Sequence, residues 1–168
     1  MILIDWENDG SFGRYYGHPD GFDSSKLMIA RLLNEYNLNF SNIRDIIQSV
    51  NIPYNLTHIT QLQKSFKKAF LDNKWINQPE YPESNYKADF GLKSNNQWIF
   101  VEIELSDIRR AVNAFFMDRV FRTAYMRLGI FITPQTRIEN KHFYSQLTKR
   151  YDYIAPDYPL WVIGFEVD

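Results

Sequence analysis

The stretch that decides the fold is KADFGLKSNNQWIFVEIELSDIRRAVNAFF, residues 87–116. Two apolar segments, 86–92 and 97–105, flank the sequence KSNN, which is typical of a β-hairpin turn. Alternation along the second segment separates its side chains onto two faces, one with Trp98, Phe100, Glu102 and Glu104, the other with Ile99, Val101, Ile103 and Leu105. The second face is entirely apolar, so we expect it in the core. The first begins aromatic and ends acidic.

The rest of the chain supplies helices before this hairpin and alternating elements after it. Apolar spacing predicts helices over 23–37, 40–50, 57–76, 106–128 and 139–153, and strands over 129–134 and 159–168. Residues 1–23, rich in Gly and Asp, are expected to form loops. This order predicts an α/β fold with a mixed central β-sheet flanked by helices. We expect a single domain over 1–168, with a mostly helical part at 1–85 and the main strands in 86–168.

Composition narrows the class of protein. The chain has 168 residues, 45% of them hydrophobic and 17% aromatic, which is typical of a packed globular protein. It contains no cysteine, which excludes disulfides, thiolate zinc sites and a cysteine nucleophile. The N-terminus resembles no signal or transit peptide, and no apolar run approaches a membrane span, so we expect a cytoplasmic protein without membrane contact. The formal charge of −1 favours no particular partner and counts mildly against nucleic acid.

The register of the hairpin decides whether the acidic residues meet. A turn with an even number of residues, centred on Ser94 and Asn95, pairs Asp89 with Phe100. Asp89 then shares a face with Glu102, its diagonal neighbour at roughly 7–8 Å. An odd turn would place Asp89 on the opposite face. In the even register, three carboxylates converge at one edge of the sheet: Asp89, Glu102 and Glu104.

Carboxylates this close repel one another unless a cation neutralises them or they bind protons. With no His or Cys nearby, oxygen-only ligands suit Mg²⁺ or Mn²⁺ better than zinc. A half-exposed strand whose two glutamates face water gives the same spacing, and acidic residues two apart also occur at 5 and 7 and at 166 and 168. The position of Asp89 and the order of strand followed by helix make the metal site as well supported as this simpler interpretation.

An aspartate in one strand, an acidic pair in the next, a long helix and a further strand together resemble the core of PD-(D/E)XK nucleases. More narrowly, residues 87–134 resemble the BglII/BstYI branch of type II restriction endonucleases and the related BamHI. Ala88 stands where these nucleases usually carry a proline. Glu104 stands where most carry a lysine, as in the BamHI-like variant.

The resemblance implies a restriction-endonuclease-like core and a Mg²⁺-dependent endonuclease, with Mn²⁺ as a possible substitute, that cuts double-stranded DNA as a homodimer. It implies that Asp89 and Glu102 are metal ligands beside the carbonyl of Ile103. Glu104 would hold or deprotonate the attacking water. A fourth acid would come from Asp72, Glu80 or Glu83, and one face of the 106–128 helix would form the dimer interface.

Basic residues are candidates for phosphate contacts. Arg109 and Arg110 begin the helix after the acidic strand. A second basic group, which touches DNA or is simply solvated, consists of Lys64, Lys67 and Lys68. For Arg119, Arg122 and Arg127 we expect a solvated helix face, with Asp107 and Asp118 as partners.

Two other functions remain open. One is a structure-selective, repair or nicking nuclease with the same fold. The other is a non-catalytic module that binds DNA or protein.

Overall fold

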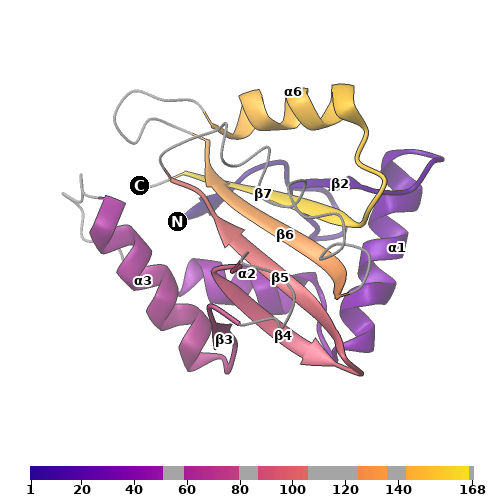
Figure 1. Cartoon of the computed structure of the whole chain (residues 1–168). Coiled ribbons are helices and arrows are strands. Elements are labelled where there is room, and N and C mark those ends of the chain that lie inside the picture. Colours follow the sequence, from indigo (N-terminus) through magenta and orange to yellow (C-terminus); the bar gives the residue numbers. More distant parts are fainter. Residues whose placement is uncertain (51–58, 80–86, 106–124, 136–142, 167–168) are drawn as a thin grey trace.

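The computed structural model describes residues 1–50, 59–79, 87–105, 125–135 and 143–166. Within them a seven-stranded mixed sheet has the order β1-β7-β6-β5-β4-β3, with β2 also paired to β7. The strands are β1 (Ile2–Leu3), β2 (Arg14–Tyr16), β3 (Ile76–Asn77), β4 (Phe90–Ser94), β5 (Gln97–Ile103), β6 (Met126–Pro134) and β7 (Leu160–Glu166). Strands β5, β6 and β7 are parallel, and the other pairs are antiparallel (Figure 1).

Helices cover both faces of the sheet. The described helices are α1 (Phe22–Glu35), α2 (Phe40–Gln48), α3 (Ile59–Asp72) and α6 (Tyr144–Ile154). Figure 1 shows α6 along one side of the sheet, apart from α1, α2 and α3. The predicted α/β architecture, a mixed central sheet flanked by helices with a helical N-terminal region, is confirmed.

Local sequence explains where these helices begin and which side they bury. The α2 helix starts at a capping box, in which the side chains of Asn39 and Asn42 accept hydrogen bonds from each other's main-chain N–H groups. Its buried face consists of Ile43, Ile46 and Ile47. In α3 the buried stripe is Leu62, Phe66, Ala69 and Phe70. These stripes pack against one face of the sheet because that is the only way to remove them from water.

Strand β5 is buried on both faces. Ile99 and Val101 lie in the core that includes residues of α1, α2 and α3. Trp98 and Phe100 lie in a second core with Tyr144 of α6. The predicted division of β5 into an apolar face and an aromatic face is therefore confirmed. The aromatic face is as deeply buried as the other until it reaches the glutamates, which are half-buried.

Three short strands lie where the sequence predicted loop or helix. β1 and β2 pair with β7, through Ile2↔Glu166 and Arg14↔Val162. β3 pairs with β4 at a position predicted to end a helix, whereas α3 ends at Asp72. Strands of two or three residues are too short for a periodic pattern, and they form because the neighbouring strand offers unpaired main-chain groups.

The predicted boundary between the 106–128 helix and the next strand was wrong. Strand β6 begins at Met126, so Arg127 lies in a strand. Its guanidinium donates hydrogen bonds of 3.0 and 2.9 Å to the carboxylate of Glu35 on α1. The predicted partners Asp107 and Asp118 lie outside the described residues. The rest of that predicted helix lies outside the described residues. No helix in the described ranges is both long and apolar enough to cross a membrane.

Candidate active site

The hairpin turn consists of two asparagines. Strands β4 and β5 pair from Phe90↔Val101 to Ser94↔Gln97, which leaves Asn95 and Asn96 as the loop. Both have positive φ, 50° and 60°, as a type I′ turn requires. Asparagine tolerates this left-handed conformation far better than serine does. The predicted turn at Ser94 and Asn95 was therefore one residue too early.

This correction changes the partner of Asp89 but not its face. Because the turn is still even in length, the predicted parity holds. The register shifts by two residues, so continuing the ladder past Phe90↔Val101 places Asp89 opposite Glu102 rather than opposite Phe100. Directly opposite residues lie closer than the diagonal pair expected from the sequence. The corrected register thus brings these two carboxylates nearer together.

Asp89 is held from two sides. Its Oδ2 accepts a hydrogen bond of 2.7 Å from the N–H of Ile103, the last residue of β5, which lies beyond the last β4–β5 pair. Its main-chain carbonyl accepts a hydrogen bond of 2.9 Å from the N–H of Gln78, which follows β3. Its side chain also shares a hydrogen bond with Glu102. These contacts fix the Asp89 carboxyl at the end of β5.

The surroundings of Asp89 disfavour its charge. Burial raises the pKa of the Asp89 carboxyl above its usual value, and the negative charge of Glu104 raises it further. Hydrogen bonds from the Ile103 N–H and with the Glu102 side chain act in the opposite direction. The net effect is an increase. A cation bound here would offset the cost of the buried, crowded negative charge.

Glu104 is positioned through its main chain. Its N–H donates to the carbonyl of Ile132 on β6 at 3.1 Å, and its carbonyl accepts a hydrogen bond of 3.0 Å from the hydroxyl of Thr133. Thr133 is fully buried. The backbone of Glu104 is therefore fixed by β6, which restricts the positions that its half-buried side chain can take.

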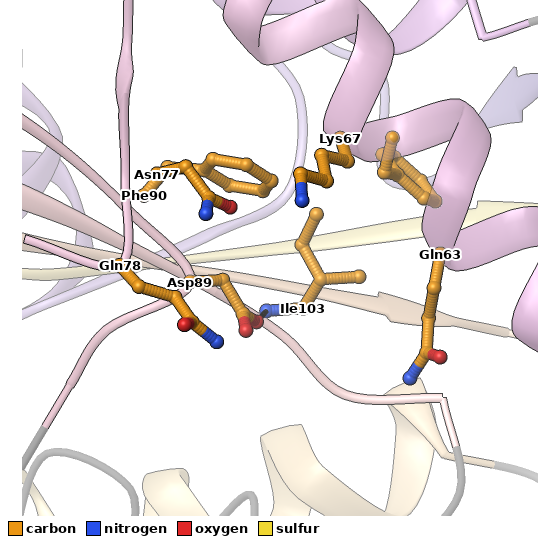
Figure 2. Close-up of a pocket in the computed structure, with 8 residues that line it drawn as sticks. Gln63, Lys67, Asn77, Gln78, Asp89, Phe90 and Ile103 are labelled. Atoms are coloured by element: carbon orange, nitrogen blue, oxygen red, sulfur yellow. Dashed lines mark hydrogen bonds between the residues drawn. The ribbon is translucent and has the colours of Figure 1, made fainter.

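A pocket of about 290 Å³ opens beside Asp89, between α3, β3 and the ends of β4 and β5. Its lining residues are Gln63, Phe66, Lys67, Asn77, Gln78, Asp89, Phe90 and Ile103 (Figure 2). Phe70 of α3 stacks on Phe90, with ring centroids 4.6 Å apart and planes 9° apart, which joins α3 to β4 next to Asp89. The pocket is thus a cleft with a helical wall from α3 and an acidic wall on which Asp89 is the one carboxylate; Glu102 and Glu104 are not among its lining residues.

The residues at this site fit a Mg²⁺ ion. No group of three or more His, Cys, Asp or Glu side chains in the described ranges is arranged closely enough to hold a metal. Mg²⁺ does not require such a group, since it is usually bound by one or two carboxylates together with water and substrate phosphate. Asp89 and Glu102 supply two adjacent carboxylates. Ile103 lies beyond the last β4–β5 pair, so its carbonyl is not used in that ladder.

The other predicted site residues are less central or lie elsewhere. Asp72 ends α3 and forms an ion pair of 2.5 Å with Lys68, and it does not line the pocket. Glu80, Glu83, Arg109 and Arg110 lie outside the described residues.

Sequence analysis did not single out Gln63, Asn77 or Gln78, and it placed Lys67 only within a general basic helix face. The signal was present in α3. Gln63 and Lys67 are four residues apart and flank the apolar stripe, whereas Lys64 and Lys68 lie on the far side of the helix. What the sequence could not supply was which element α3 faces.

Comparison with known proteins adds evidence on the fold. No protein-family model and no curated protein matches this sequence. Among solved structures, the restriction endonuclease BglII in complex with a DNA 16-mer superposes with a TM-score of 0.61 over 82% of this chain and 74% of that chain, at 16% sequence identity. At this identity the likeness establishes the fold alone. The chain has a restriction-endonuclease-like fold.

Proposed function

We propose that this chain is a Mg²⁺-dependent endonuclease that hydrolyses DNA phosphodiester bonds, and specifically a type II, site-specific enzyme acting as a homodimer. The observation that carries the proposal is the adjacent placement of Asp89 and Glu102 at the end of β5, beside an open pocket. The structural likeness to BglII, which was solved with DNA bound, supports double-stranded DNA as the partner.

In this proposal Asp89, Glu102 and the carbonyl of Ile103 hold the metal. Bound there, Mg²⁺ (or Mn²⁺ in its place) would lower the pKa of a water molecule and stabilise negative charge on the scissile phosphate. The Ile103 N–H keeps Asp89 turned toward the strand end through its 2.7 Å hydrogen bond. Arg109 and Arg110 are proposed as contacts to neighbouring phosphates.

In the same proposal, Glu104 orients the attacking water. Its main chain is fixed on both sides by β6, and its charge is close enough to raise the pKa of Asp89. A carboxylate held in this way can accept a proton from water while the phosphodiester bond to the 3′ oxygen breaks. In this proposal the three carboxylates have two different tasks, metal binding and water activation.

The test is cleavage of supercoiled plasmid DNA in Mg²⁺ by the wild type and by Glu102→Ala. Glu166→Gln is the matched control, because Glu166 is a half-buried glutamate at the end of the parallel strand β7, away from the pocket. We expect discrete fragments from the wild type and from E166Q. The rate of E102A should fall at least about a hundredfold. If the wild type and E102A are equally inert on every DNA tried, or equally active, the enzyme proposal is wrong.

The same assay separates the finer alternatives. A site-specific enzyme gives discrete bands, a non-specific or structure-selective nuclease gives a smear or cuts only unusual DNA, and a nicking enzyme stops at the open circle. Sedimentation of the protein with and without a duplex carrying the mapped site tests the homodimer.

A further inference from the structure

A lysine from a distant part of the chain enters the pocket that contains Asp89. Lys67 and Gln63, on successive turns of α3, both line this pocket. Figure 2 shows the Lys67 ammonium pointing from the helix toward Ile103, whose N–H is bonded to Asp89. The helical wall therefore presents a cation and a carboxamide to the acidic wall.

The other two lysines of this helix are placed differently. Successive residues of an α-helix are about 100° apart around its axis. Gln63 and Lys67 fall at the border of the stripe that α3 buries, while Lys64 and Lys68 fall on the side away from the sheet. Lys68 is also paired with Asp72. Of the three, only Lys67 lines the pocket.

The charge of Lys67 is not used to neutralise the neighbouring acids. Within the part of the chain that the structure describes, Lys67 has no ion-pair partner. The groups that shift the pKa of Asp89 are Ile103, Glu102 and Glu104, together with burial, and Lys67 is not among them. Lys67 is an exposed residue that lines the pocket, so its ammonium is available to a ligand there.

A phosphodiester in this pocket would lie beside Asp89, which itself interacts with Glu102 and Glu104, so it needs such a cation. The phosphate brings one more negative charge to Asp89, Glu102 and Glu104, and a single divalent ion neutralises only part of the total. A lysine on the opposite wall attracts the phosphate and opposes the repulsion from the carboxylates. The carboxamides of Gln63 and Gln78 can add N–H donors to the non-bridging oxygens.

We propose that Lys67, assisted by Gln63, binds the DNA backbone phosphate that enters the pocket beside Asp89. This inference rests on the proposed endonuclease function and adds a substrate-binding residue to it. It also gives the site a positive charge although Glu104 stands at the position where most of the nucleases that the sequence resembles carry a lysine. The positive charge reaches the phosphate from α3 instead of from β5.

The test compares Lys67→Ala, Lys67→Arg and the matched control Lys64→Ala in two assays. The first is the rate of plasmid cleavage in Mg²⁺. The second is binding of a short fluorescein-labelled duplex, carrying a cleavage site mapped on the plasmid, measured by anisotropy in Ca²⁺ at several salt concentrations. Thermal unfolding of each variant controls for folding.

We expect K67A to cleave at least about a hundredfold more slowly than wild type. The slope of log binding constant against log salt should become shallower by about 0.9 for each protomer, as expected when one phosphate contact is lost. K67R should retain the salt slope because it keeps the charge. K64A should match wild type in both assays, and all variants should unfold at the wild-type temperature because both lysines are exposed.

Other results overturn the inference in distinguishable ways. If K67A and K64A lose the same salt slope and rate, Lys67 is only part of a general basic surface. If K67A matches wild type while E102A is inert, the inference fails and the proposed function stands. If the wild type cuts no DNA, the proposed function fails and the inference fails with it.

Discussion

Replacing Gly164 with alanine should destabilise the protein through one specific contact. Gly164 lies in β7, beneath α6. A Cβ added at this position would lie 2.5, 2.6 and 2.9 Å from the Cγ, Cδ2 and Cδ1 atoms of Tyr144. Carbon atoms in contact are normally about 3.5–4.0 Å apart, so the ring would have to withdraw by about 1 Å.

Tyr144 has little freedom to withdraw. Its side chain is 3% exposed, and its hydroxyl donates a hydrogen bond of 2.7 Å to Oδ2 of Asp5. Overpacking of this kind costs about 1–3 kcal/mol. Loss of a hydrogen bond to a charged group adds about 1.5–3 kcal/mol. We therefore expect G164A to lower the free energy of unfolding by about 3 kcal/mol, which corresponds to a fall in Tm of about 6–12 °C for a chain of this size.

The assay is urea unfolding followed by circular dichroism, with Tyr144→Ala as a second background. An alanine normally suits a strand interior better than glycine by about 0.5–1 kcal/mol. In the Y144A background G164A should therefore be neutral or stabilising, which gives a coupling energy of at least about 2 kcal/mol between the two sites. Equal costs in the two backgrounds, or no cost in either, would refute the reasoning.

Three further predictions concern the candidate active site and the hairpin that carries it. Asp89→Asn should stabilise the metal-free protein at pH 7, because the pKa of Asp89 is raised in the folded state and folding is therefore penalised when this carboxyl is charged. The stabilisation should fade as the pH falls from that raised pKa to the unfolded-state value of about 4. Urea unfolding between pH 3 and 8, in roughly unit steps, checks it. Asn96→Gly should stabilise the hairpin by about 0.5 kcal/mol and Asn96→Val should destabilise it by about 1–2 kcal/mol, since residue 96 has a φ of 60°; equal stabilities would contradict the two-asparagine turn. Thr133→Val removes the donor to the Glu104 carbonyl and should slow plasmid cleavage about tenfold, while Thr133→Ser should keep the wild-type rate. Equal rates for the two variants would show that this hydrogen bond does not position Glu104.

The parts of the fold that the sequence predicted are those with a repeated pattern. The first three helices and the hairpin strands each contain several apolar residues at regular spacing, so their type and approximate limits follow from periodicity. The short strands β1, β2 and β3 have no such pattern. They depend on the exposed main-chain groups of β7 and β4, which are tertiary features.

The candidate site was predictable to the level of a sheet face but not of a register. An even number of turn residues is enough to place Asp89 on the same face of the sheet as Glu102, whichever residues form the turn. The exact partner depended on whether serine or asparagine occupies a left-handed position, a preference of about 1–2 kcal/mol at most. The sequence could not predict that α3 forms a wall of the pocket, since the helical pattern shows which side of a helix is buried but not which element that side faces.

The stack of Phe70 on Phe90 makes the width of the pocket a property of the hydrophobic core. Phe90 follows Asp89 directly in the chain, and Phe70 lies one helical turn from Lys67. The acidic wall and the helical wall are therefore spaced by two buried rings, of which Phe90 lines the pocket and Phe70 does not. Substitutions at Phe70 therefore offer a way to change the width of the cleft, and with it the affinity for a ligand, without altering a side chain that lines it.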